Sequence, residues 1–320
     1  MHSEPKSEPD LSWDAPEALE AGALIERALA EDLPAGDLTS DFLFPAGSDE
    51  APAPGVLPGM GVVARCVARE AGVFCGAPVV EALFAELEDE VRVSVLASEG
   101  SKVAQGDVLL ELSGPAAAVL RAERVLLNFL QRLCGIASWT ARWVEELEGI
   151  EVVLLDTRKT TPGWRRLEKY AVRSGGGTNH RFDLSDAVMI KDNHSWIMRR
   201  SGGTTVADWV SALRAASPGA FLQVEVDSRE EYLEALEVDA IDSILLDNFP
   251  PGELAWAVEE KRRRESTALL EASGGIGLGN VRQVAETGVD RISVGALTHS
   301  AVALDVSLEL SELFNLEQKK

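Results

Sequence analysis

The 320-residue sequence is poor in cysteine, with only 3, and no two of them form a CxxC pair. Cys66, Cys75 and Cys134 therefore predict neither a zinc site nor a disulfide framework, and we interpret them as small core residues. The sequence also lacks a run of about 20 apolar residues, the length that a membrane-spanning helix needs. Its start, MHSEPKSEPD, lacks the basic and apolar segments of a secretory signal. These absences predict a cytoplasmic protein with no membrane partner.

Basic residues are few, 30 Lys and Arg against 53 Asp and Glu, which gives a formal net charge of −23. So acidic a surface repels nucleic acid, and we expect no nucleic-acid partner. An anionic substrate is not excluded, because a local cluster of Arg and Lys outweighs the more distant charges. Hydrophobic residues make up 46% of the chain, which is enough for a substantial core and argues against global disorder.

The first third of the chain predicts an α+β domain. Residues 13–31 have the spacing of an amphipathic helix, and the Pro and Gly residues of 45–61 predict a surface loop. Strand-like alternation dominates 62–113, around one helical segment at 77–87. Mixed strands with one helix are typical of an α+β sandwich.

The chain after residue 148 predicts parallel strands joined by helices. A long helical stretch at 116–148, interrupted at Gly135, precedes them. Short apolar runs then recur about every 20 to 35 residues, the spacing of βα units. Six such runs predict a closed or nearly closed α/β barrel. They are VVLLD at 152–156, AVMIK at 187–191, FLQVEV at 221–226, SILLD at 243–247, ALLEAS at 268–273 and RISVG at 291–295.

Each of these runs ends in charged, hydroxyl-bearing or glycine residues. In parallel α/β barrels, the residues at the C-terminal strand ends converge on one active site. A polar residue at a single strand end can be a simple cap, but six such ends together favour a shared mouth. The residues are Asp156, Thr157, Arg158 and Lys159 after the first run, then Lys191, Glu225, Asp247, Ser273 with Gly274 and Gly275, and Gly295.

Cations are concentrated between the end of the first run and the end of the second, in a segment otherwise rich in turns. Arg forms paired hydrogen bonds to planar carboxylates and phosphates, while Lys acts as a point charge. The cluster therefore predicts a polyanionic ligand, with salt bridges to nearby acids as the alternative. Its members are Arg158, Lys159, His180, Arg181 and Lys191.

Glu225 and Asp247 end neighbouring runs and predict one of two roles. Together they are able to hold Mg²⁺ that carries phosphates, or to stabilise positive charge on a sugar ring. The alternative is ion pairing with Lys191 or Arg181.

Glycine-containing segments end the last two runs, at 273–275 and at Val294, Gly295 and Ala296. Loops after the last barrel strands often present backbone N–H groups to phosphate, and glycine permits the close approach. Arg124 lies in the helical stretch before the barrel, where a single charge is most simply a solvated helix residue.

Several long strings resemble the quinolinate phosphoribosyltransferase family, in order and with similar spacing. The resemblance covers roughly residues 13–312. The strings are EDLPAGDLTSDFLFP, RAERVLLNFLQRLCGIAS, DTRKTTPGWRRLEKYAV, GGGTNHRFDLSDAVMIKDNH, VEVD, LLDNF, EASGGI and SVGALTHS.

The resemblance implies an N-terminal α/β sandwich at residues 1–117 and an incomplete α/β barrel at 118–300. It implies a C-terminal helix within 301–320 that packs back on the sandwich. It also implies a homodimer in which the partner's Arg124 completes each active site, which replaces the solvated reading of that residue.

By resemblance, each candidate residue acquires a role. Arg158, His180, Arg181 and the partner's Arg124 would meet the quinolinate carboxylates. Lys159 and Lys191 would lie near quinolinate and pyrophosphate, and Glu225 and Asp247 would contact the ribose hydroxyls and Mg²⁺; we expect these four to be catalytic. Ser273, Gly274 and Gly295 would hold the 5′-phosphate, with His299 nearby, and Thr157, Gly275, Val294 and Ala296 complete the predicted substrate-binding set.

The implied reaction is phosphoribosyl transfer from phosphoribosyl pyrophosphate to quinolinate with decarboxylation, as in de novo NAD biosynthesis. Three alternatives stay open at this point. One is a related transferase with another heteroaromatic acceptor. Another is a Schiff-base lyase that uses Lys191, and the third is a noncatalytic protein that binds phosphate ligands.

Overall fold

The computed structural model describes residues 11–45, 54–87, 90–202 and 205–316, and within them the chain forms two compact units. The first unit contains Met1–Ala141, Thr161–Gly176 and Ala301–Lys320, and the second contains Arg142–Thr160 and Gly177–Ser300. These units differ from the predicted domains. The chain passes from one to the other inside a long helix, and residues 161–176, which sequence placed in the barrel, belong to the first unit.

The first unit is built on a four-stranded antiparallel sheet in the order β12-β1-β5-β3. The central strand β1 (Met60–Ala68) is buried along most of its length, as its apolar run predicts. A short pair, β2 (Gly72–Val73) with β4 (Lys102–Val103), lies apart from this sheet. The other three strands are β3 (Arg92–Val95), β5 (Val108–Pro115) and β12 (Val306–Asn315).

The first two helices of the first unit begin after capping aspartates, Asp14 and Asp37. Helix α1 (Ala15–Asp32) starts after Asp14, whose Oδ1 accepts the Glu17 amide at 3.2 Å. Residues 46–53 of the predicted loop at 45–61 lie outside the described residues. The remaining helices are α2 (Leu38–Leu43), α3 (Ala77–Glu86), α4 (Ala116–Glu146) and α5 (Arg165–Ser174). The three cysteines are free and buried, as predicted.

Helix α4 is continuous, so the predicted interruption at Gly135 is wrong. Glycine serves packing at this position instead. A Cβ on Gly135 would lie 2.9 Å from the Cα of Ala303 and would also meet the carbonyl oxygen of Val302. The missing side chain therefore lets the segment that leads to β12 pass directly over the helix.

Replacing Gly135 by alanine is expected to lower the free energy of unfolding by about 1–3 kcal/mol, because the added methyl group collides with backbone that cannot rotate away. Urea denaturation followed by circular dichroism measures this change. The matched control is Gly22→Ala in α1, where a Cβ meets nothing within 4 Å. That variant should gain about 0.5–1 kcal/mol from helix propensity. Equal effects of the two substitutions would contradict the packing role of Gly135.

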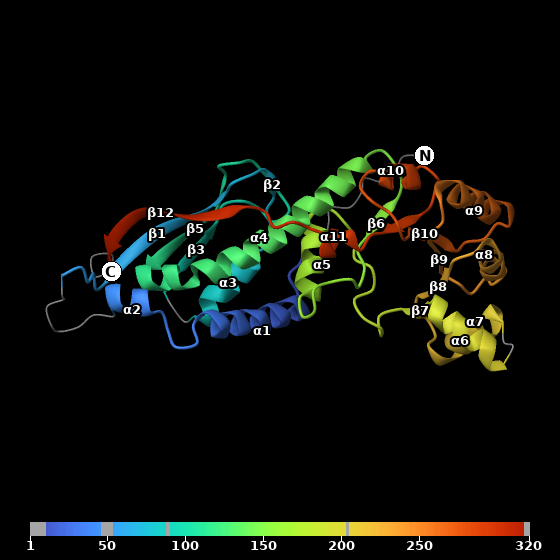
Figure 1. Ribbon diagram of the computed structural model, residues 1–320, viewed down its shortest axis with the longest axis horizontal. Coiled ribbons are helices and arrows are strands. Elements are labelled where there is room, and N and C mark those ends of the chain that lie inside the picture. The colour runs from blue at the N-terminus through green and yellow to red at the C-terminus, as the bar shows by residue number, and fades with distance from the viewer. Residues whose placement is uncertain (1–10, 46–53, 88–89, 203–204, 317–320) are drawn as a thin grey trace. The chain divides into compact units, whose positions relative to one another are not determined.

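The C-terminal helix implied by the resemblance is wrong, because residues 306–315 form the strand β12. The segment does pack back on the first unit, where it pairs with β1 over the whole length of that strand, from Met60–Asn315 to Ala68–Val306. Figure 1 shows β12 in red alongside β1 in blue. The segment becomes a strand because the edge of β1 offers unpaired backbone N–H and C=O groups, which form hydrogen bonds with an extended segment.

The second unit confirms the predicted incomplete barrel. Its six strands are parallel in the order β6-β11-β10-β9-β8-β7, and within the described chain no ladder joins β7 to β6. Thr178 forms a bridge to Leu155 and extends the β6 side of the opening. The strands are β6 (Val153–Leu155), β7 (Val188–Ile190), β8 (Leu222–Val226), β9 (Ser243–Asp247), β10 (Leu269–Ser273) and β11 (Arg291–Ser293).

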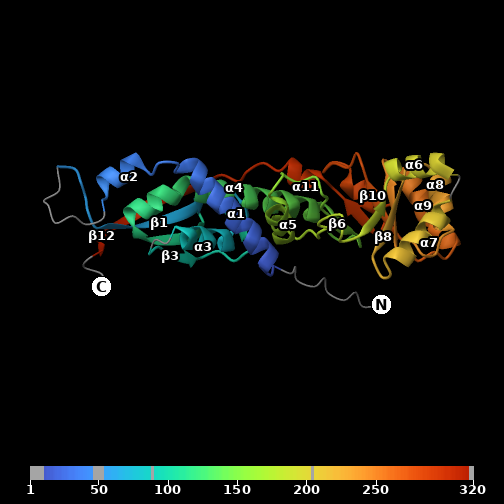
Figure 2. The same ribbon diagram turned by 90° about the horizontal axis from the view of Figure 1, so that it is seen from below.

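Helices cover the outer face of this sheet. Figures 1 and 2 both show α6, α7, α8 and α9 beyond the strands on one side. None of the described helices is long and apolar enough to cross a membrane. The helices of the unit are α6 (Asp192–Gly202), α7 (Val206–Ala216), α8 (Arg229–Leu236), α9 (Pro251–Arg263), α10 (Val281–Ala285) and α11 (Ala296–His299).

Candidate active site at the barrel mouth

The C-terminal ends of the barrel strands enclose a cavity of about 250 Å³. Side chains alternate along a strand, so every second residue faces the barrel interior. Pairs two residues apart on one strand accordingly recur in the lining, such as Met189 with Lys191 and Leu245 with Asp247. The lining residues are Thr157, Arg158, Lys159, His180, Arg181, Met189, Lys191, Glu225, Leu245, Asp247, Glu271, Ser273 and Ser293. The structure therefore brings the predicted cations and both predicted carboxylates into one site.

Arg158 and Arg181 lie close enough for their charges to repel each other, while nearby acids, Glu225 among them, act in the opposite direction. Arg181 donates from Nη1 to the Ala187 carbonyl at 2.9 Å and from Nη2 toward the Met189 sulfur at 3.3 Å, so its side chain is held in place. Burial and the nearby charge of Arg158 lower the pKa of the Arg181 guanidinium. Buried like charges repel each other, and an anionic ligand relieves that repulsion.

Lys191 and Glu225 form the ion pair that the sequence left as an alternative, with Nζ and Oε2 separated by 3.3 Å. The Lys191 side chain is 46% exposed, whereas that of Glu225 is 12% exposed. An exposed pair of this kind contributes little to stability. Either partner is therefore able to exchange the other for a ligand at small cost.

Asp247 is held by its neighbours at the end of β9. Its Oδ2 accepts the side-chain amide of Asn248 at 2.8 Å. Burial raises the pKa of Asp247, while Lys159, Lys191 and the Asn248 hydrogen bond act in the opposite direction. Asn248 has a φ of 59°, in the left-handed region that asparagine tolerates better than most residues. Sequence reasoning missed Asn248, although an asparagine next to the end of a strand is a signal for such a turn.

Gly274 is required beside this carboxylate. Its φ is +83°, and a Cβ there would lie 2.8 Å from Oδ1 of Asp247 and would also collide with the Asn248 side chain. Residue 274 has no side chain, and this allows the loop after β10 to lie close to Asp247. Gly275, with a φ of +62°, continues the same turn.

Gly295 has a similar function next to Lys159. A Cβ on Gly295 would lie 2.9 Å from Cδ of Lys159 and 3.1 Å from Nε2 of His299. The Thr298 hydroxyl donates to the Lys159 carbonyl at 2.9 Å, which ties the loop after β6 to α11. Val294 does not line the cavity, since it is 3% exposed and its amide donates to the Leu155 carbonyl within the sheet.

Two buried carboxylates received no role from the sequence, although Asp156 was placed among the strand ends that converge on the mouth. Asp156 and Glu271 are both 0% exposed, and each contacts the segment that carries His180. Glu271 lies two residues before Ser273 on β10, so strand alternation would have pointed it inward. Its position inside an apolar run, and not at the end of one, hides this role in the sequence.

Known proteins resemble this chain along most of its length. Models of the quinolinate phosphoribosyl transferase N-terminal and C-terminal domains match residues 37–134 and 136–309. The chain is 42% identical over 304 residues to a carboxylating nicotinate-nucleotide pyrophosphorylase of Mycobacterium leprae, covering 94% of this chain and 99% of that protein. The chain belongs to the quinolinate phosphoribosyl transferase family.

Further relatives agree with this membership. A human carboxylating nicotinate-nucleotide pyrophosphorylase is 42% identical over 246 residues, which cover 76% of this chain and 80% of the human protein. The solved structure of the nicotinate-nucleotide pyrophosphorylase from Francisella tularensis has a TM-score of 0.80 at 34% identity, covering 92% of this chain and 97% of that one. The predicted fold, enzyme class and function, phosphoribosyl transfer to quinolinate with decarboxylation in NAD biosynthesis, are thereby confirmed. The Schiff-base lyase and the noncatalytic binding protein are set aside.

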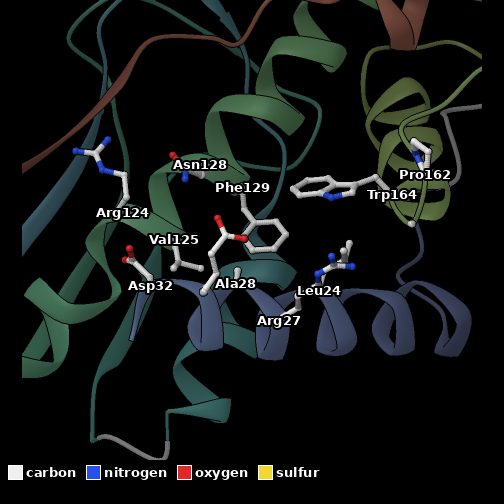
Figure 3. Close-up of a pocket in the computed structure, with 12 residues that line it drawn as sticks. Leu24, Arg27, Ala28, Asp32, Arg124, Val125, Asn128, Phe129, Pro162 and Trp164 are labelled. Carbon is white, nitrogen blue, oxygen red and sulfur yellow. The ribbon is translucent and has the colours of Figure 1, made fainter. Parts of the chain in front are cut away.

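Within this quinolinate phosphoribosyl transferase, Arg124 does not line the barrel cavity. It belongs to the first unit, where it lies on α4 at the rim of a second cavity of about 430 Å³. Figure 3 shows Phe129 and Trp164 facing each other between α1 and α4, with Arg124 at the end of the pocket opposite Pro162. The two rings stack with centroids 4.9 Å apart. Arg124 itself is exposed.

Proposed function

We propose that the barrel cavity binds quinolinate and phosphoribosyl pyrophosphate side by side and transfers the phosphoribosyl group between them. The observation that carries this proposal is the gathering of cations and two carboxylates from separate strand ends in one cavity. A dianionic acceptor and a polyphosphate donor both need cations, and a sugar ring that becomes positive needs carboxylates nearby.

The acceptor is assigned to the side of the cavity that carries Arg158, His180 and Arg181. Nε of Arg158 is buried and has no hydrogen-bond partner among the described residues. A buried N–H without a partner costs free energy, which a ligand oxygen would recover. A quinolinate carboxylate is well suited to this position, because guanidinium and carboxylate groups pair in one plane.

The sugar of the donor is assigned to Glu225 and Asp247. In this mechanism the pyridine nitrogen attacks C1 of the ribosyl group, and the bond from C1 to the pyrophosphate oxygen breaks with its electron pair on the leaving group. Positive charge develops on the ring, and the two carboxylates stabilise it. Loss of the 2-carboxylate as CO₂ then leaves an electron pair on the ring carbon, which takes up a proton.

Lys159 and Lys191 are assigned to the leaving pyrophosphate. The backbone of residues 273–275, Gly295 and Ala296, with the Ser273 hydroxyl, is assigned to the 5′-phosphate, and Val294 is left out because its amide is bound within the sheet. The left-handed turn at Gly274 and Gly275 supports this assignment, since such turns point successive N–H groups toward an anion.

The carboxylate pair also suits Mg²⁺ that arrives with the donor. The described residues contain no group of three or more His, Cys, Asp and Glu side chains that could hold a metal ion by themselves. Mg²⁺ is commonly held by one or two carboxylates together with substrate phosphates, and Glu225 and Asp247 would supply that number. When bound, the ion would neutralise charge on the pyrophosphate.

The active unit is proposed to be a homodimer, in which the partner's Arg124 reaches the barrel cavity. Support comes from the placement of Arg124, exposed at the rim of an aromatic-lined pocket and absent from the cavity of its own second unit. A cytoplasmic location stays a prediction from the sequence.

A complementation experiment tests the dimer. Arg124→Ala alone should lose about 10- to 100-fold in activity through the loss of a charged hydrogen bond. Asp247→Asn should be nearly inactive because it removes a negative charge that would stabilise the ribosyl ring. The two variants are combined in equal amounts, unfolded together and refolded. Half of the dimers then contain one chain of each variant, and each such dimer has one intact site. Activity with quinolinate should therefore recover to about a quarter of the wild-type value.

Activity that does not rise above the average of the two variants would place Arg124 in the site of its own chain. Wild-type enzyme with quinolinate and with nicotinate as parallel acceptors gives the baseline. Nicotinate mononucleotide formed from quinolinate alone supports the assigned acceptor, and product from nicotinate alone would overturn it.

A further inference from the structure

A polar layer lies beneath the barrel cavity, where barrels usually hold branched apolar side chains. Gln223, Ser243 and Glu271 are each buried, with at most 1% exposure. Nε2 of Gln223 donates to Oε2 of Glu271 at 2.8 Å and to Oγ of Ser243 at 3.1 Å. A buried carboxylate costs free energy unless it is paired, so the charge of Glu271 requires an explanation beyond packing.

Glu271 is paired with His180. Its Oε1 lies 3.4 Å from Nε2 of the imidazole, a long contact, and this buried oxygen has no hydrogen bond of good geometry among the described residues. Burial alone would raise the pKa of Glu271, but the nearby His180 imidazole, with hydrogen bonds from Ser293 and Gln223, holds it below its ordinary value. The carboxylate therefore stays ionised and presents a negative oxygen to the ring nitrogen.

The other ring nitrogen of His180 has a different partner. The backbone amide of Arg181 donates to Nδ1 at 2.7 Å. A nitrogen that accepts a hydrogen bond carries no proton, so the proton of the neutral ring is on Nε2, facing Glu271. Both ring nitrogens are thus engaged inside the protein, and His180 holds a backbone in place as well as lining the cavity.

The backbone that His180 holds carries Arg181 across the opening of the barrel. Asp156 anchors the same segment, because its Oδ1 accepts the His180 amide at 2.9 Å and its Oδ2 accepts the Asn179 side chain at 2.6 Å. At its far end, the Arg181 guanidinium is bound to Ala187 on the approach to β7. Two buried carboxylates, on β10 and after β6, thus fix the cation segment.

We propose that Glu271 is a positioning residue for the acceptor: its carboxylate keeps the His180 proton on Nε2, which leaves Nδ1 free to hold the Arg181 backbone in its binding position. This inference rests on the proposed assignment of Arg181 to quinolinate. Glu271 lines the barrel cavity beside His180, and in this arrangement it acts on the acceptor through that imidazole. A cation that is already held in its binding position loses little conformational entropy when quinolinate binds. Glu271 therefore increases the affinity for quinolinate by holding Arg181 in place through His180.

The test is Glu271→Gln, which keeps the shape and removes the charge. Without the charge, only the Arg181 amide still favours the Nε2–H tautomer, and a ring protonated on Nδ1 turns a donor toward that amide. The KM for quinolinate should rise about 10-fold or more, the size seen when a group that orients a histidine is removed. The KM for phosphoribosyl pyrophosphate should change less than about two-fold, since its assigned cations lie elsewhere.

Ser243→Ala is the matched control. It removes a hydrogen bond from the same buried layer without touching His180. It should lower the melting temperature and leave both KM values near those of the wild type. If Ser243→Ala raised the KM for quinolinate as much as Glu271→Gln does, the effect would belong to the stability of the layer and the proposal would fail.

A second measurement needs no variant at Glu271. The chain has only 4 histidines, so long-range ¹⁵N–¹H spectra of histidine-labelled wild-type enzyme, assigned with His180→Gln, read the tautomer directly. For the neutral ring, the expected result is a bare Nδ1 and a protonated Nε2. A proton on Nδ1 overturns the proposal. A wild-type enzyme that forms no product from quinolinate would overturn the proposed function instead. The spectrum reports on the His180 tautomer alone, so it distinguishes that failure from a failure of the Glu271 proposal.

Discussion

Replacing Asp247 by asparagine is expected to lower kcat about 10³-fold, while calorimetry shows quinolinate binding within about three-fold of the wild-type affinity. The substitution keeps the shape of the side chain and removes the negative charge that would face the ribosyl ring as pyrophosphate leaves. Charge that develops only in the transition state affects kcat and leaves acceptor binding alone. Steady-state kinetics with quinolinate and phosphoribosyl pyrophosphate, together with the calorimetric titration, give both numbers.

Asp239→Asn supplies the control for this substitution. Asp239 is exposed, in the turn that precedes β9, at the opposite end of that strand from Asp247. The same chemical change should there leave kcat and affinity unchanged. Loss of quinolinate binding in the Asp247 variant would count against the assignment of Asp247 to the donor and move it to the acceptor.

Gly274→Ala is expected to lower kcat about 10²- to 10³-fold and the free energy of unfolding by about 1–2 kcal/mol. The stability loss arises from a φ of +83°, which alanine adopts reluctantly. The loss of turnover arises from the methyl group, because it would lie 2.8 Å from Oδ1 of Asp247 and force that carboxylate or Asn248 to move.

Gly219→Ala separates these two effects. Gly219 has nearly the same backbone, with a φ of +84°, and a Cβ there meets nothing within 4 Å. It should therefore show the stability loss alone, measured by urea denaturation, with normal turnover. Equal losses of turnover in both alanine variants would mean that backbone strain, and not displacement of Asp247, inactivates the enzyme.

The barrel and its mouth could be predicted because local patterns determine them. A buried parallel strand needs an uninterrupted apolar run, and the first polar residue after the run marks its end. Asp247 after SILL and Lys191 after AVMI were identified in this way, and the structure brings both into the same cavity.

Features that depend on distant parts of the chain were missed. Glu271 lies inside an apolar run, and its charge is explained only by the contact with His180, 91 residues earlier in the chain. Gly135 resembles a helix breaker until the segment at Val302 is placed against it. The helix expected at the C-terminal end is a strand because β1 offers an edge, a fact that no window of local sequence contains.

The pairing of β12 with β1 has a consequence for biosynthesis. Val63 and the Ser311 hydroxyl that bonds to its carbonyl are 248 positions apart. During synthesis on the ribosome, β1 and β5 emerge early, yet the edge of β1 that β12 will cover stays bare until nearly the whole barrel has been made. Contacts so distant in sequence form slowly, and an unpaired strand edge invites association with other chains. The first unit to be translated is therefore the last to be completed, and translation pauses or C-terminal truncations should threaten its solubility before they affect the barrel.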